Sequence, residues 1–206
     1  AEQTSFVSLP SSACIECHAD AFADWQKSHH FHAQRAIGTA LDEAAFASNP
    51  LFHGDFETQF TKFGDAFKLR TTFPDETTRT FTAEYAFGYL PLVQYLVPFG
   101  NGRYQVTDIA YDPAENEWFN TFGEQNRQPE EWGFWTNRGM NWNSQCAYCH
   151  NTRFEKNFDS ETDGYQSTFV EMGVSCVQCH NVPRGHLEQP ETFRVERLEP
   201  TAQVES

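Results

Sequence analysis

One short motif occurs three times in the chain and constrains its fold more than any other feature. Cys-x-x-Cys-His appears as "CIECH" at 14–18, "CAYCH" at 146–150 and "CVQCH" at 176–180, here called motifs one, two and three. Together the motifs use all six cysteines. With 8 His in 206 residues, a histidine follows a given residue about one time in 26 by chance. Each cysteine pair and its histidine therefore form one chemical unit.

Three chemistries compete for these cysteines: disulfides, zinc and covalent haem c. Disulfides place no demand on the following residue, and zinc sites pair two Cys-x-x-Cys units or add distant histidines. Only haem attachment requires a histidine directly after every pair. The motifs therefore predict three haems c, numbered as their motifs. The thioether residues are Cys14, Cys17, Cys146, Cys149, Cys176 and Cys179, and the proximal iron ligands are His18, His150 and His180.

The spacing within a motif suits a helix. Cys14, Cys17 and His18 stand at i, i+3 and i+4 and would share one helix face. Pro10, Ser11 and Ser12 lie just upstream, where serine hydroxyls can cap free amide groups. We therefore expect one helix that carries motif one and continues through Phe22 and Trp25. Motifs two and three should form short helices or single turns.

The sixth iron ligands must come from the histidines outside the motifs. Five are left for three distal positions: His29, His30, His32, His53 and His186. On a continuous helix His29 and His32 share the Cys14 face and cannot easily reach the far side of haem one. We therefore expect "SHHFH" to serve haems two and three, or a haem in another molecule. Met140 and Met172 are interpreted as packing residues.

His30 and His186 are the first choices for distal ligands. Pro183 and Gly185 form a turn that can swing His186 towards a neighbouring haem. The third ligand would come from His29, His32 or His53, for each of which an ordinary surface or core position is equally open.

The fold class expected is α+β with little regular secondary structure, organised around the haems as a single domain over 1–206. A strong hairpin signal, Gly100-Asn101-Gly102, stands between Val93–Phe99 and Arg103–Tyr111. We divide the chain into a haem-one segment at 11–48, a β-rich insertion at 55–125, a segment for haems two and three at 135–190, and an extended tail at 191–206.

Charge and hydropathy exclude several functions. Lys and Arg number 14 against 29 Asp and Glu, so nucleic acid and anionic membrane surfaces are poor partners. The longest apolar run, "YLPLVQYLVPF", is far shorter than the roughly 20 residues of a membrane span. The start "AEQTSFVS" fits a chain whose secretory signal has been removed. We expect an exported protein, extracellular or periplasmic.

The chain resembles multihaem c-type cytochromes in which the first motif is followed by Trp-x-x-Ser-x-His, here Trp25, Ser28 and His30. The likeness continues through "PLVQYLVPFGNGRYQV", "NWNSQCAYCHNT" and "GVSCVQCHNVPRGH", segments similar to cytochromes often fused to tetratricopeptide repeats. The resemblance implies that His30 and His186 are distal ligands and that attachment takes place outside the cytoplasm. "NVPRG" replaces the Gly-Pro usual after the last motif. The chain is also similar to subunits of extracellular cytochrome filaments.

These observations predict electron transfer without substrate chemistry, and so no enzyme. The expected form is a homopolymer in which haem three of one subunit approaches haem one of the next, with redox proteins or extracellular acceptors as partners. One alternative is a monomeric periplasmic shuttle. Another is a reductase of the nitrite or hydroxylamine type, which needs one haem open beside acid/base groups.

Overall fold

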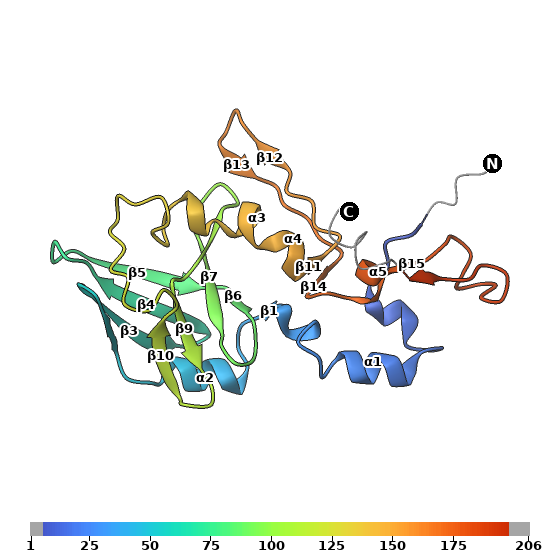
Figure 1. The fold of residues 1–206 in the computed structure, drawn as a ribbon, viewed down its shortest axis with the longest axis horizontal. Coiled ribbons are helices and arrows are strands. Elements are labelled where there is room, and N and C mark those ends of the chain that lie inside the picture. The colour runs from blue at the N-terminus through green and yellow to red at the C-terminus, as the bar shows by residue number, and fades with distance from the viewer. Residues whose placement is uncertain (1–5, 198–206) are drawn as a thin grey trace.

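Antiparallel strands fill the middle of the chain in the computed structural model, which describes residues 6–197 (Figure 1). Two four-stranded sheets in this part run in the orders β1-β6-β7-β8 and β2-β3-β4-β5, and a hairpin pairs β9 with β10. The strands are β1 (Gln34–Ala36), β2 (Leu51–His53), β3 (Phe56–Phe63), β4 (Ala66–Thr72), β5 (Thr78–Ala83), β6 (Tyr85–Phe87), β7 (Gln94–Pro98), β8 (Tyr104–Val106), β9 (Ile109–Asp112) and β10 (Glu117–Asn120). The β-rich stretch is present, but β1 and β2 come from residues upstream of 55.

The predicted hairpin is confirmed. Strands β7 and β8 pair with Leu96 opposite Val106, and Arg103 donates its amide hydrogen to Gly100 across the turn. All three turn residues have positive φ, which glycine and asparagine tolerate best. The glycines and Asn101 therefore determine where the strand reverses.

An aromatic core holds the two sheets together. Alternate residues of β3 and β4 point inwards, and the Phe46 side chain packs edge-on against four aromatic rings of this core. Trp118 stacks on Phe60 with ring centroids 3.9 Å apart. Much of the aromatic content is thus used in the sheet core and is not available to cover haem.

The sheet that contains β7 is buried on both faces. Tyr95 and Val97 point into the aromatic core, whereas Leu96 points to the other side and packs with Trp142 and Ala147. This second cluster also contains Cys146 and Met140, so it forms the wall behind motif two. Burial on two faces explains why "YLV" is continuously apolar rather than alternating.

Helices are short, as the α+β prediction expects. They are η1 (Ser11–Cys14), α1 (Ala19–Trp25), η2 (Phe31–Ala33), α2 (Ala40–Phe46), η3 (Arg138–Met140), α3 (Trp142–Gln145), α4 (Ala147–His150) and α5 (Cys176–Cys179). Motifs two and three form single turns, as predicted. The continuous helix through motif one is wrong: His18 adopts φ −127° and ψ 40° and separates η1 from α1. The amide of His18 still bonds to Cys14, because one turn suffices to bring the three residues together.

The serine capping expected upstream of motif one is also wrong. Pro10 precedes η1 and no side chain caps this helix. Ser11 is buried instead and donates its hydroxyl to the carboxylate of Glu171, 160 residues away, at 2.6 Å. Its amide donates to the same carboxylate at 3.0 Å. The start of motif one is therefore anchored by a tertiary contact.

Three small ladders follow motif two. They pair β11 (Asn151–Thr152) with β14 (Glu171–Met172), β12 (Phe158–Asp159) with β13 (Gly164–Tyr165), and β15 (His180–Asn181) with β16 (Glu196–Arg197). The expected tail thus includes a strand, and its residues 198–206 lie outside the described part. No helix within 6–197 is long and apolar enough to cross a membrane.

Candidate haem-binding site

Motifs one and three touch each other despite their distance in sequence. The thiols of Cys14 and Cys176 lie close enough for each to affect the pKa of the other. The Ser11–Glu171 contact fixes the same junction from one side. Motifs one and three are therefore immediate neighbours in space.

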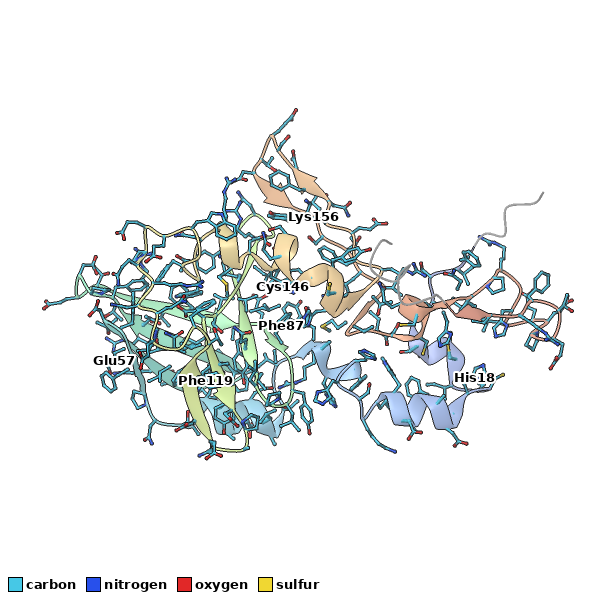
Figure 2. All side chains as sticks on the ribbon, in the orientation of Figure 1. His18, Glu57, Phe87, Phe119, Cys146 and Lys156 are labelled. Carbon is cyan, nitrogen blue, oxygen red and sulfur yellow. The ribbon has the colours of Figure 1, made fainter. Side chains whose placement is uncertain are left out.

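Motif two reaches motif three through the residues that follow its histidine. Asn151 and Thr152 pair with Met172 and Glu171, just upstream of motif three. One residue further on, the amide of Arg153 donates to the side chain of Gln178 at 2.9 Å, within α5. Motif three therefore contacts both other motifs. Figure 2 shows His18 of motif one and Cys146 of motif two well apart on either side of this junction.

The Trp-x-x-Ser-x-His segment lies against the approach to motif three. Trp25 donates its indole hydrogen to the carbonyl of Val174 at 2.8 Å, and the carbonyl of His30 accepts from the amide of Val174 at 2.9 Å. Ser28 closes the turn between them by donating to the Trp25 carbonyl. A Cβ on Gly173 would lie 2.9 Å from the His30 carbonyl oxygen, so only glycine permits this approach. The segment thereby places His30 beside motif three.

His150 of motif two has the geometry of an iron ligand. Its Nδ1 lies 3.2 Å from the carbonyl oxygen of Ala33, so Nδ1–H donates and Nε2 is the nitrogen left to bind a metal. The ring stacks on Phe87 with centroids 4.0 Å apart. Burial lowers the pKa of His150, which favours the neutral imidazole that iron binds.

Gln34 holds motif two at both ends and was not predicted from the sequence. Its side-chain oxygen accepts from the indole of Trp142 at 2.8 Å, upstream of Cys146, and from the side-chain Nδ2 of Asn151 at 2.9 Å, directly after His150. Strand β1 also places Gln34 opposite Phe87. A lone glutamine carries no chemical signature, and only the tertiary structure reveals its role.

The first cysteine of each motif is partly buried. Burial raises the pKa of Cys146 to about 11, and it raises the pKa of Cys176 to about 11 as well. All six cysteines are free of disulfides. Thioether attachment to haem requires thiols that are free of disulfides.

The distal candidates are scattered over the structure. His29 and His30 are exposed, and His32 is half-buried and stacks on Tyr89 with centroids 4.2 Å apart. His186 donates Nδ1–H to the carbonyl of Phe193 at 2.7 Å, which leaves its Nε2 for a ligand, as in His150.

His53 lies elsewhere, in the four-stranded sheet that Figure 1 shows at the far end from α5. It stacks on Phe56 of the aromatic core with centroids 5.5 Å apart. Burial lowers its pKa to about 4. These surroundings suit a core histidine, and the sites of all five distal candidates stay predictions.

Four buried polar side-chain atoms within the described residues lack a partner: His32 Nδ1, Asn151 Oδ1, Arg153 Nε and Ser175 Oγ. Buried polar groups are normally hydrogen-bonded, so this concentration beside the motifs points to a group that completes the site. The residues present therefore fit haem c. Thioethers would come from the cysteine pairs and proximal ligands from His18, His150 and His180. When bound, haem c supplies one-electron redox chemistry.

The protein class defined by this site is that of the multihaem c-type cytochromes. The family model described as "Cytochrome c554 and c-prime" matches residues 13–63 and 117–181, more than half of the chain, and the chain belongs to this family. The matched residues contain all three motifs, whereas much of the β-rich stretch and His186 lie outside them. Membership of this family implies covalently bound haem c.

One solved structure has a similar fold. The chain aligns with "Crystal Structure of Outer Cell Wall Cytochrome OcwA" with a TM-score of 0.55 and 19% identity over 97% of its length. It spans 36% of that protein. No curated protein matches the chain.

Proposed function

We propose that the chain binds three haems c and conducts electrons through them without substrate chemistry. The proposal rests on the junction at motif three. This motif contacts motif one through Cys14 and Cys176, and it contacts the segment directly after motif two through Arg153. Such contacts give an electron path in the spatial order one, three, two. A conductor needs this continuity, whereas an enzyme would need one iron left open beside acid/base groups.

Bis-histidine ligation at each iron is the second part of the proposal. The Nδ1 hydrogen bonds of His150 and His186 leave Nε2 of each ring for iron. His30 lies beside motif three, in keeping with the distal role that the family resemblance implies. Two histidine ligands favour low-spin iron with lower potentials than histidine and methionine together.

The spatial order of the three motifs changes which haems are expected to meet at the contact between two subunits. Because motif three lies between the other two, the ends of the haem row within one chain are haems one and two. We therefore propose a homopolymer in which haem two of one subunit approaches haem one of the next, in place of a haem-three joint. A head-to-tail contact of this type gives a fibre when it does not close into a ring.

An extracellular or periplasmic location is proposed with this function. Haem c attachment outside the cytoplasm is implied by the family resemblance, and the neighbour of similar fold is titled an outer cell wall cytochrome. Redox proteins or extracellular acceptors would then exchange electrons with the two end haems.

Mass spectrometry of the denatured protein together with electron paramagnetic resonance of the native ferric protein tests the proposal. We expect three haem additions, three low-spin paramagnetic resonance signals and, in the optical absorption spectrum of the ferric protein, no methionine charge-transfer band. Fewer additions would refute the three-haem conductor. Stoichiometric binding of carbon monoxide or nitrite to one haem of the native protein would instead show an open iron, contradict bis-histidine ligation at that haem and favour the reductase.

A further inference from the structure

The junction between motifs two and three contains an unusual arginine. Arg153 follows His150 by three residues, with its backbone in the left-handed region at φ 51°. Its guanidinium donates to the carbonyl of Val177 in α5 at 2.7 Å, and its amide bonds to Gln178. Arg153 thus bridges the two motifs from a half-buried position.

The positive charge of Arg153 has no counter-ion among residues 6–197. The ion pairs found there involve Lys27, Arg35, Lys62, Arg103 and Arg138, each with a carboxylate. Arg153 Nε is buried and has no hydrogen-bond partner. A buried guanidinium normally has a carboxylate or phosphate partner, because an unpaired buried charge is costly. In a chain with 29 acidic residues, an unpaired and partly buried arginine needs an explanation.

A second unpartnered donor lies in the same junction. Ser175, directly before Cys176, is 3% exposed, and its hydroxyl has no partner. The Ser175 amide bonds to the Thr152 side chain at 2.8 Å, which ties it to the residue before Arg153. An N–H and an O–H that are both buried and unused require an acceptor, and a carboxylate satisfies both.

We propose that Arg153 and Ser175 bind a propionate carboxylate of haem two or haem three. Each haem c carries two propionates, so the anion arrives with the cofactor that these motifs attach. The cation raises the midpoint potential of that haem, because it destabilises the more positive ferric form. This inference rests on the proposed presence of haems two and three.

Redox titration of individual haems in the full three-haem protein tests the site. We expect Arg153→Gln to lower the midpoint of haem two or haem three by about 59 mV, a tenfold change in its one-electron equilibrium. Glutamine still offers a donor to Val177, so the turn at α5 should persist. Arg153→Lys keeps the positive charge and should therefore lower that midpoint potential by less than Arg153→Gln does. Ser175→Ala should lower the midpoint potential of the same haem. Ser175 caps no helix amide with its side chain, so its loss leaves α5 intact.

The control is Arg138→Gln, which removes the same charge from a side chain that is 78% exposed. It should leave every midpoint unchanged. Infrared difference spectra provide a second readout, in which the propionate carboxylate band should shift in the Arg153 and Ser175 variants alone.

The outcomes separate this inference from the proposed function. Fewer than three haems in the wild-type protein would remove the proposed function itself. Three haems with unchanged midpoints and unchanged carboxylate bands in the Arg153 and Ser175 variants would overturn the propionate site alone, as would an equal shift in Arg138→Gln. If Arg153→Gln loses a haem, Arg153→Lys and Ser175→Ala decide the question.

Discussion

Gln34 illustrates how one buried side chain can position a whole motif. Its oxygen satisfies two donors that bracket motif two, and the preceding carbonyl, from Ala33, binds His150. Replacing Gln34 with Met keeps the volume and removes the acceptor. Each of the two buried donors left without a partner costs about 1–3 kcal/mol, so we expect Gln34→Met to lower the free energy of unfolding by about 2–6 kcal/mol.

Denaturant titration measures this loss, and redox titration should show a changed midpoint for haem two only. Gln59→Met is the matched control on the exterior of β3, where the change should lie within about 0.5 kcal/mol. A Gln34→Met protein as stable as wild type, with all midpoints unchanged, would contradict the positioning role.

His53 should make stability depend on pH. Its folded pKa of about 4 lies below the unfolded value of about 6.5, so protonation favours the unfolded chain. The contribution is present above pH 6.5 and is lost as pH falls towards 4, by about 3 kcal/mol in all. We expect His53→Phe, which keeps a ring against Phe56, to remove this dependence in thermal unfolding at pH 4 to 7.

Asp108 supplies the opposite control for that experiment. Burial raises its pKa to about 6, so its contribution is present below the unfolded pKa and is lost as pH rises through 6. Asp108→Asn should therefore make stability rise more steeply with pH.

The His53→Phe variant also tests whether His53 is a distal ligand. Unchanged low-spin spectra in this variant would remove His53 from the distal candidates, whereas loss of one bis-histidine signal would make it a ligand.

At the scale of elements, the β12–β13 hairpin connects the part of the chain that carries motifs two and three with the turn between β7 and β8. Arg103 pairs with Asp163 at 3.0 Å, and the amide of Tyr165 donates to the carbonyl of Asn101. A Cβ on Gly102 would lie 1.9 Å from the Tyr165 carbonyl oxygen, where there is no room for it. The turn between β7 and β8 is thus both a hairpin and a docking point.

Two glycine variants separate these functions of the turn. Gly100 and Gly102 both have positive φ, but nothing lies within 4 Å of a Cβ at Gly100. Gly100→Ala should cost only backbone strain, about 1–2 kcal/mol. Gly102→Ala should cost more, because the hairpin must also move, and should speed proteolysis between residues 156 and 166. Equal losses of unfolding free energy in the two variants would refute the docking contact.

What the sequence predicts at this scale depends on how local the cause is. The turn glycines and the motif spacing act over a few residues, so the β7–β8 hairpin and the single turns α4 and α5 are predicted correctly. Pairing of β1 with β6 joins residues 49 to 53 positions apart, and the Ser11–Glu171 contact joins residues 160 apart. No local pattern reports such partners. For the same reason the cysteines and proximal histidines follow from the motif, whereas Gln34 and Arg153 do not.

For the whole molecule, net charge opposes the proposed polymer. The formal charge is −15, to which haem propionates add, and like-charged subunits repel each other. Because the Debye length falls from about 30 Å at 0.01 M salt to about 3 Å at 1 M, assembly should strengthen with ionic strength. Light scattering across this range, with electron microscopy at the upper end, should show particles growing into fibres. A homogeneous monomer at every salt concentration, with all six axial ligands traced to one chain, would leave the periplasmic shuttle.

The contact between Cys14 and Cys176 also determines when the protein can be completed during its synthesis. Cys14 precedes its packing partner, Cys176, by 162 residues, so synthesis and the proposed export both deliver motif one long before motif three. Contacts between residues so far apart in sequence form late in folding, because closing the long loop between them costs conformational entropy before the contacts can stabilise the fold. With the proposed three haems, a haem attached at motif one would therefore have one side uncovered until motif three is present. Completion of the site at motif one would then depend on motif three, and a product truncated before motif three would leave that haem exposed to solvent.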